Sequence, residues 1–163
     1  MRVFEQKCNS FYYEKSLSRI NYLYEKNNIN DQIEIINNIK TPKISSLFEQ
    51  IDWREINAGV PVNFHGDLHF ENIIKNKNKI TLLDWREDFS SIKNYVDIYY
   101  DLAKINHGLI IDHNIIKRSK FDVKIDKKKI KINFVQSKEN KDCQKLFFKF
   151  LKDNNYSLLK VKI

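Results

Sequence analysis

Residues 65–74 read HGDLHFENII, and this stretch decides how the middle of the chain is interpreted. Asp67 and Asn72 come just before a short apolar run, and a second apolar run that follows a polar turn contains Asp84 near its end. Two such runs predict a β-hairpin. They cover residues 72–75 and 80–85. Because antiparallel pairing brings the start of one strand next to the end of the other, the three polar side chains could converge at one edge.

The three side chains would form a set of hard oxygen ligands. Two carboxylates and an amide oxygen suit Mg²⁺, which keeps several waters and binds substrate phosphates. An Asp that is not used by the metal can orient and deprotonate a hydroxyl group, which is the division of labour in phosphoryl transfer from ATP. Each residue alone is most simply a solvated turn or a cap. Their joint occurrence at hairpin spacing favours the site.

The composition predicts one compact cytoplasmic domain. The 163 residues are 42% hydrophobic and 13% aromatic, which is enough for a real core and argues against disorder. No stretch approaches the roughly 18 uncharged apolar residues of a membrane span, so we expect none. The N-terminal residues lack the apolar block of a secretory signal. Cys8 and Cys143 are therefore expected to be reduced thiols.

The positive charge is concentrated at the end of the chain. The net charge is +8, and residues 117–163 hold 15 basic and 5 acidic residues. This tail could be a surface for nucleic acid or an anionic membrane, and a nucleic-acid-binding module is one alternative function. However, Arg118 is its only Arg, and polyanion-binding surfaces usually draw on Arg. Lys alternates with apolar residues over 120–131, which is typical of a protected edge hairpin, so we expect no nucleic-acid partner.

Hydrophobic spacing predicts a mainly helical α+β fold for the chain as a whole. We expect helices over residues 11–26, 31–39, 44–53, 97–111 and 143–151, a short strand over 62–64, and a second hairpin from 121–126 and 129–134. Asp31 is a good N-cap for the second of these helices. In the last helix, four apolar residues are expected to face the core: Leu146, Phe147, Phe150 and Leu151.

Three motifs in this order resemble the aminoglycoside phosphotransferase and choline kinase superfamily. They are HGDLHFENII at 65–74, LLDW at 82–85 and DIYYDLA at 97–103. More narrowly, FHGD, LDWR and DLAK are similar to phosphotransferase-family proteins found beside bacterial capsule and surface-polysaccharide genes. The match is specific over residues 62–112. It implies that residues 1–163 form a single domain, the mainly helical C-terminal lobe of a protein-kinase-like fold with a catalytic β-hairpin and a second small hairpin.

The resemblance implies an ATP- and Mg²⁺-dependent transfer of the γ-phosphoryl group to a small-molecule hydroxyl. Asp67 matches the catalytic base of the family. Asn72 matches the amide ligand of Mg²⁺, and Asp84 matches the carboxylate that links Mg²⁺ to the ATP phosphates. The acceptor stays open among a sugar, an amino alcohol and an aminoglycoside-like compound, and surface-polysaccharide metabolism is one setting for such a reaction.

Four further residues match supporting positions of the family. His65 matches a residue that packs and hydrogen-bonds behind the catalytic loop, and Asp101 matches a helix carboxylate that braces the backbone of that loop. Ile74 and Leu83 match apolar residues that line the adenine floor. Both also read as ordinary core residues of a strand.

The family's ATP site lies between two lobes, and the sequence does not predict the first of them. That lobe brings a loop over the phosphates and a Lys that pairs with them. Only ten residues precede the helix expected from Phe11, and the chain has three Gly, so we expect the N-terminal β lobe to be absent. The lobe could then be active alone, could depend on a separate chain that supplies the missing half, or could be a non-catalytic remnant.

A rival interpretation makes His65, Asp67 and His69 a metal-ligand triplet like that of metallophosphoesterases. Those enzymes need an upstream Asp-x-His and a downstream Gly-Asn-His, and the sequence has neither. The remaining histidines, His107 and His113, fall on or just after a predicted helix, where ordinary histidines are common.

Overall fold

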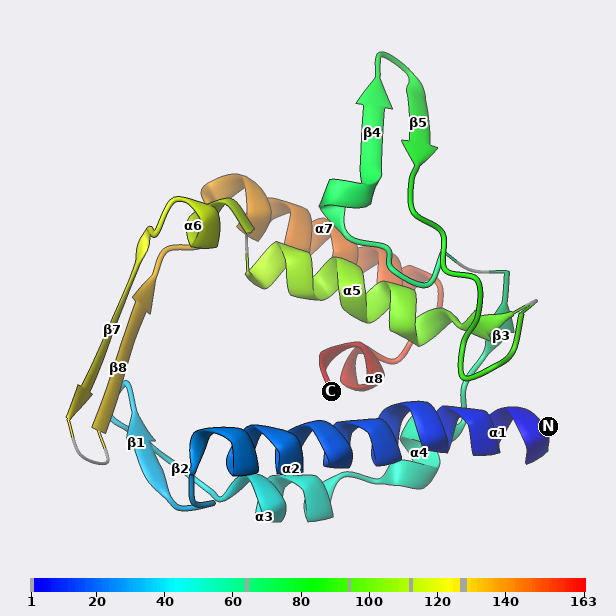
Figure 1. Ribbon diagram of the computed structural model, residues 1–163. Helices are drawn as coiled ribbons and strands as arrows, with labels where there is room; N and C mark the ends of the chain where they lie inside the picture. The colour runs from blue at the N-terminus through cyan, green and yellow to red at the C-terminus, as the bar shows by residue number, and fades with distance from the viewer. Residues whose placement is uncertain (1, 64, 94, 112, 127–128) are drawn as a thin grey trace.

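Figure 1 shows the computed structural model of the chain, which describes residues 2–63, 65–93, 95–111, 113–126 and 129–163. The fold is α+β, as expected, with 50% of the residues in helices and 21% in strands. The strands form one four-stranded and two two-stranded sheets. Among the described residues, no helix has both the length and the apolar character that a bilayer crossing requires.

A long helical segment begins the described chain. It consists of α1 (Arg2–Asn9), a π-helical segment η1 (Ser10–Glu14) and α2 (Lys15–Asn27), which run end to end in Figure 1. The predicted helix over residues 11–26 is confirmed, but the helical segment begins earlier, at Arg2. It ends at Asn28, whose φ of 49° gives a left-handed C-cap.

The prediction of a helix over residues 31–39 is wrong. Strands β1 (Glu34–Ile36) and β2 (Ile39–Thr41) form an antiparallel hairpin there. Asn37 and Asn38 have φ values of 49° and 66°. This left-handed backbone, which Asn tolerates, is what a two-residue hairpin turn needs. The β-branched isoleucines that suggested one face of a helix instead fit the pleat of a strand.

Asp31 is a helix cap, but not of the helix that was predicted. Its carboxylate accepts hydrogen bonds from the backbone N–H groups of Ile44 at 2.9 Å and Ser45 at 3.1 Å. These residues begin α3 (Ile44–Gln50). Hydrogen bonds from Ser45 lower the pKa of Asp31 to about 2. Asp31 therefore caps a helix that begins 13 residues later in the chain, and local sequence spacing does not predict such a contact.

The predicted helix over residues 44–53 is two short helices, α3 and α4 (Trp53–Asn57). Between them the Asp52 carboxylate accepts hydrogen bonds from the backbone N–H groups of Arg54 at 3.0 Å and Glu55 at 3.3 Å. A side-chain acceptor at this position starts a new helix. The segment is therefore helical as expected, with one break.

The predicted second hairpin is confirmed as β7 (Phe121–Asp126) and β8 (Lys129–Phe134). Residues 127–128, between the two predicted strands, lie outside the described residues. β8 also pairs in parallel with β1, which gives a four-stranded sheet in the order β2-β1-β8-β7. The Asn37 side chain links the strands, because it donates to the carbonyl of Ile132 at 2.9 Å and accepts from its N–H at 2.8 Å.

The predicted helix over residues 97–111 is confirmed as α5 (Ile98–Ile110), which forms the centre of one core. α7 (Lys138–Asp153) and α8 (Leu158–Lys162) pack on it, and the short α6 (His113–Lys117) follows it. The buried members of this core are Tyr99, Leu102, Leu151 and Val161. A second core joins α1 to the segment after the central hairpin, through Phe4, Cys8, Phe89 and Val96.

α7 contains the predicted helix over residues 143–151 but is longer at both ends. Leu151 is fully buried and Phe147 is partly buried, as expected. The inward placement predicted for Leu146 and Phe150 is wrong, because these side chains are 68% and 46% exposed. α5 and α8 cover only one stripe of α7, so apolar residues outside that stripe stay on the surface.

The central hairpin is confirmed as β4 (Ile73–Asn76) and β5 (Lys79–Leu82), and it projects away from the helices in Figure 1. It ends at Leu82, earlier than predicted. A short 3-10 turn, η2 (Phe70–Asn72), precedes it. At its base, β3 (Pro61–Val62) pairs with β6 (Val96–Asp97). The predicted strand over 62–64 is therefore shifted, and residue 64 lies outside the described residues.

Candidate functional site

The site is built on the loop between β3 and η2. Gly66 has a φ of 81°, a backbone conformation that L side chains rarely adopt, so the sharp turn before Asp67 requires glycine. This turn carries Asp67 to Lys104 of α5, and the residue is only 7% exposed there. A buried carboxylate is costly unless it is paired, so its surroundings are informative.

Asp101 and His65 hold this loop from behind. The Asp101 carboxylate on α5 accepts hydrogen bonds from the backbone N–H groups of His65 at 2.9 Å and Gly66 at 3.0 Å. The Nδ1 atom of His65 accepts from the N–H of Asp67 at 3.3 Å, so Nε2 carries the proton and donates to the carbonyl of Leu83 at 2.6 Å. Contacts of this kind behind the loop are what the sequence resemblance implied for Asp101 and His65.

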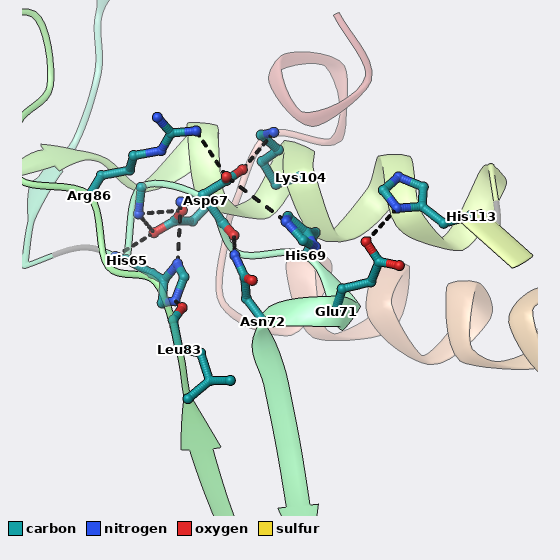
Figure 2. A network of polar contacts seen from close by, with 11 residues as sticks. His65, Asp67, His69, Glu71, Asn72, Leu83, Arg86, Lys104 and His113 are labelled. Atoms are coloured by element: carbon teal, nitrogen blue, oxygen red, sulfur yellow. Dashed lines mark hydrogen bonds and ion pairs between the residues drawn. The ribbon is translucent and has the colours of Figure 1, made fainter. Parts of the chain in front are cut away.

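Hydrogen bonds connect both ends of the central hairpin to the loop that carries Asp67 (Figure 2). The Asn72 side-chain amide donates to the carbonyl of Asp67 at 3.0 Å, and the N–H of Leu83 donates to the carbonyl of Asn72 at 2.9 Å. The N–H of Arg86 donates to the carbonyl of His65 at 2.9 Å. Asp84 lies between these last two anchor points, so its backbone is next to the loop of Asp67.

Asp84 itself has a left-handed backbone, with a φ of 57°. A non-glycine residue in this region is uncommon, and such residues are concentrated at functional sites. In the described part of the chain, no group donates a hydrogen bond to the Asp84 carboxylate. This conformation turns the backbone sharply just after β5, so Asp84 does not continue the strand.

Two cations hold the Asp67 carboxylate. Lys104 Nζ lies 2.7 Å from Oδ1, and the Arg86 guanidinium donates to Oδ2 at 3.0 Å. The Nε2 atom of His69 is 3.9 Å from Oδ2. Burial raises the pKa of the Asp67 carboxyl, but the two ion pairs outweigh burial and hold this pKa below its ordinary value. Asp67 is therefore ionised at neutral pH.

Sequence reasoning did not assign a role to Arg86 or Lys104. Both lie inside quoted motifs, Arg86 at the end of LDWR and Lys104 at the end of DLAK. Their spacing carries no signal of its own, because charged residues are common after a strand and on a helix. They become part of the site because α5, which carries Lys104, and the segment after the hairpin, which carries Arg86, both pack next to Asp67.

The residues present fit a magnesium ion. The Asn72 amide nitrogen is used by the loop, so its Oδ1 is free to be a ligand, and no described residue donates a hydrogen bond to that oxygen. Asp84 follows Leu83, whose N–H is hydrogen-bonded to the carbonyl of Asn72, so the backbone of Asp84 lies close to Asn72 and its carboxylate is a second candidate ligand. No cluster of three or more His, Cys, Asp or Glu side chains suited to a metal ion occurs in the described ranges. Mg²⁺ does not need such a cage, because it keeps water ligands and binds phosphate.

Ile74 and Leu83 are not core residues. Their side chains are 49% and 41% exposed, which excludes the alternative reading of both as buried strand residues. Ile74 lies on β4 and Leu83 directly follows β5, and two other apolar side chains of this region are exposed, Ile80 on β5 and Trp85 just beyond it. The surface that the resemblance assigned to the adenine base is therefore open.

The histidines do not form the rival metal triplet. Both ring nitrogens of His65 are used by hydrogen bonds within the loop, and Asp67 is paired with cations.

His113 begins α6 and contacts Glu71 at 3.0 Å, and Lys117 pairs with the same carboxylate. Hydrogen bonds from Lys117 and His113 lower the pKa of Glu71 to about 2.

The structure thus brings Asp67, Asn72 and the backbone on either side of Asp84 to one place, with Asp101 and His65 behind them. It leaves Ile74 on the adjoining hairpin and Leu83, which directly follows that hairpin, open to solvent. Comparison with known proteins gives no match to this chain among protein-family models, curated proteins or solved structures.

Proposed function

We propose that this chain is the catalytic lobe of a small-molecule phosphotransferase that uses ATP and Mg²⁺ and has a kinase-like arrangement. One observation carries the proposal. A buried, ionised Asp67 lies on a glycine turn whose backbone is tied to Asn72 and, through His65, to Leu83 and Arg86. Hydrogen bonds therefore tie the loop of the candidate base to the segments that carry the two candidate oxygen ligands, and phosphoryl transfer depends mainly on such positioning.

In this reaction Asp67 orients the acceptor hydroxyl and takes its proton. The hydroxyl oxygen forms a bond to the γ-phosphorus while the bond from that phosphorus to the bridging oxygen breaks, and ADP leaves with the electron pair. Because the pKa of Asp67 is low, it is a weak base. A weak base is sufficient, since the transition state is loose and the proton leaves late.

Asn72 and Asp84 are the residues that would hold Mg²⁺, through the amide Oδ1 and the carboxylate. When bound, the ion neutralises charge on the phosphates of ATP. The exposed Ile74 and Leu83 provide an apolar surface for the adenine ring. Arg86 and Lys104 keep positive charge beside Asp67, where negative charge accumulates during transfer.

One form of this proposal is a lobe that is completed by further polypeptide, such as a separate chain. The first strand among the described residues begins at Glu34, after a helical segment, so this part of the chain offers no β lobe to cover the hairpin. The exposed apolar side chains of the hairpin fit such a cover. A non-catalytic remnant predicts the same surface, and only a measurement of nucleotide binding separates the two.

The test is titration calorimetry of ATP with Mg²⁺ into the purified chain, with and without Mg²⁺. We expect binding that requires Mg²⁺ and that Asp84→Ala weakens at least about tenfold, because one metal ligand is lost. Asp122→Ala on β7 is the matched control, since it removes an exposed Asp whose one ion pair among the described residues is with Lys124. Binding that is equal in both variants would remove Asp84 from the site, and no binding at all would contradict nucleotide binding by this chain on its own.

A further inference from the structure

A cavity of about 690 Å³ lies beside the loop of Asp67. Its walls come from η1, the first turns of α2, the segment after the central hairpin and α5. Gly66 lines it, so the cavity reaches the catalytic loop itself. Four cations from three parts of the chain converge on it: Lys15, Arg19, Arg86 and Lys104.

The cavity carries an excess of positive charge. Its two lining carboxylates are Glu14 and Asp88. Glu14 accepts a hydrogen bond from the Ser10 hydroxyl at 2.8 Å, and Asp88 accepts one from the N–H of Ser91 at 3.3 Å, so each is held within its own segment. Arg86 and Lys104 also pair with the adjacent Asp67 carboxylate, so four cations against three carboxylates leave one unbalanced positive charge, which favours an anionic ligand.

The cations are close enough to affect one another. Partial burial lowers the pKa of the Lys15 ammonium, and the charges of Arg19 and Arg86 lower it further. In the described part of the chain neither Lys15 nor Arg19 forms an ion pair. Cations gathered in this way repel one another and are stabilised by an anion that binds among them.

The backbone around the cavity has two unusual features. The π-helical segment η1 forms one wall, and π-helical turns inside α-helices are frequent at functional sites. Ser90 and Ser91, on another wall, have φ values of 50° and 69°. Non-glycine residues in this conformation cluster at ligand sites. These features support the cavity as a shaped site.

The cavity and the proposed nucleotide site lie on different sides of Asp67. Figure 2 shows Arg86 and Lys104 on one side of Asp67, and Asn72 and Leu83 at the base of the hairpin on the other. Among the described residues, the hairpin, Asn72 and Asp84 do not line the cavity. A ligand in the cavity would therefore approach Asp67 from the side opposite to the nucleotide, which is where an acceptor must lie for in-line transfer.

We propose that this cavity binds the phosphate group of the acceptor, so that the substrate is a phosphorylated hydroxy compound of sugar-phosphate size. This inference rests on the proposed phosphotransferase function. Lys15 and Arg19 bind the phosphate, while a hydroxyl of the same molecule reaches Asp67. The hydroxyl gives its proton to Asp67 and receives the γ-phosphoryl group, and the products are ADP and a bisphosphorylated compound. The phosphate already present on the acceptor is not cleaved.

The experiment measures binding without nucleotide, so that it does not depend on catalysis. Glucose 6-phosphate and glucose are titrated into the full chain by calorimetry or NMR. We expect the phosphate ester to bind and glucose not to bind. Arg19→Gln should weaken that binding at least tenfold. Lys26→Gln, an exposed cation further along α2, should change it less than twofold, and circular dichroism should show both variants folded.

Three outcomes would overturn the inference. The first is equal binding of glucose and its phosphate ester, and the second is equal binding by Arg19→Gln and Lys26→Gln. The third is displacement of glucose 6-phosphate by ATP with Mg²⁺, together with loss of ATP binding in Arg19→Gln, which would make the cavity the nucleotide site. Failure of the proposed function looks different, because binding of the phosphate ester would persist while binding of ATP would be absent.

Discussion

Two buried aspartates show how one residue type serves two purposes in this molecule. Asp67 lies beside a cavity and is paired with two cations, Arg86 and Lys104. Asp97 is fully buried where β6 meets α5, and its hydrogen-bond donors are neutral. Charge partners lower the pKa of Asp67, whereas burial raises the pKa of Asp97. A carboxylate held ionised beside a cavity suits chemistry, and one surrounded by neutral donors suits a structural joint.

The Asp97 joint connects distant parts of the chain. Its Oδ1 accepts from the backbone N–H groups of Val60 at 2.9 Å and Tyr99 at 3.3 Å, and its Oδ2 accepts from the Tyr12 hydroxyl at 2.9 Å. Gly59 is packed so closely that a Cβ there would lie 2.8 Å from Asp97 Cγ. The joint therefore fixes η1, β3 and α5 to one another, and these elements in turn position the loop of Asp67.

The two residues also respond oppositely to pH. The lowered pKa of Asp67 means that its contribution to stability is present above its unfolded pKa of about 3.9 and is lost as the pH falls through its native value. The raised pKa of Asp97 means that its contribution is largest below the same unfolded value and is lost as the pH rises through its native value.

The largest effect should come from Asp67→Asn. We expect phosphoryl transfer to fall by about 10²–10⁴-fold, the usual contribution of general acid–base catalysis. The fold should be retained, because Asn keeps the shape and one oxygen acceptor. Rates are measured as ADP formation with a panel of hydroxyl acceptors, and stability is measured by urea unfolding. Unchanged turnover would show that Asp67 is not the base.

Asp97→Ala should have the largest effect on stability. It leaves two backbone N–H groups and the Tyr12 hydroxyl without their buried acceptor, and we expect a loss of about 3 kcal/mol in the free energy of unfolding. Asp97→Asn is the matched control. Its Oδ1 can keep both backbone donors while the Tyr12 hydroxyl rotates to accept, so the loss should be clearly smaller. Equal losses in urea unfolding would mean that the negative charge, rather than the acceptor, is what matters.

Lys104→Met should shift the pH dependence of activity rather than abolish the fold. Lys104 is the first of the two cations that lower the pKa of Asp67, so its removal raises that pKa. The acid limb of the pH–rate profile should then move to higher pH, because Asp67 must be ionised to accept a proton. A profile that only falls in height, with the limb unmoved, would contradict this coupling between α5 and the loop.

The smallest effect should come from Glu71→Gln, away from both aspartates. Lys117 and His113 lower the pKa of Glu71 from 4.5 to about 2, so its contribution is present at neutral pH and is lost as the pH falls toward 2. The variant should lower the urea midpoint slightly at pH 7 and by less at pH 3. Because the pair is exposed, an unmeasurable shift at both pH values would mean that solvent screens it completely.

Local sequence was sufficient where turn residues and periodicity agree. The central hairpin, the β7–β8 hairpin and α5 were all predicted, because each is specified by contacts within a few residues. The segment 31–39 was not, because its isoleucines fit either a helix or a strand. Pairing with β8, about 95 residues later, decides between them. The spacing of apolar residues within 31–39 cannot predict a strand partner so far away in the sequence.

The same division holds for the site. The sequence by itself determined the residue types, the glycine turn and the order of the motifs, because these depend on short-range backbone geometry. Only the tertiary structure decided that Arg86 and Lys104 pair with Asp67 and that Lys15 and Arg19 join them around one cavity. The physical reason is that ion pairing depends on distance in space, and elements far apart in sequence supply those charges.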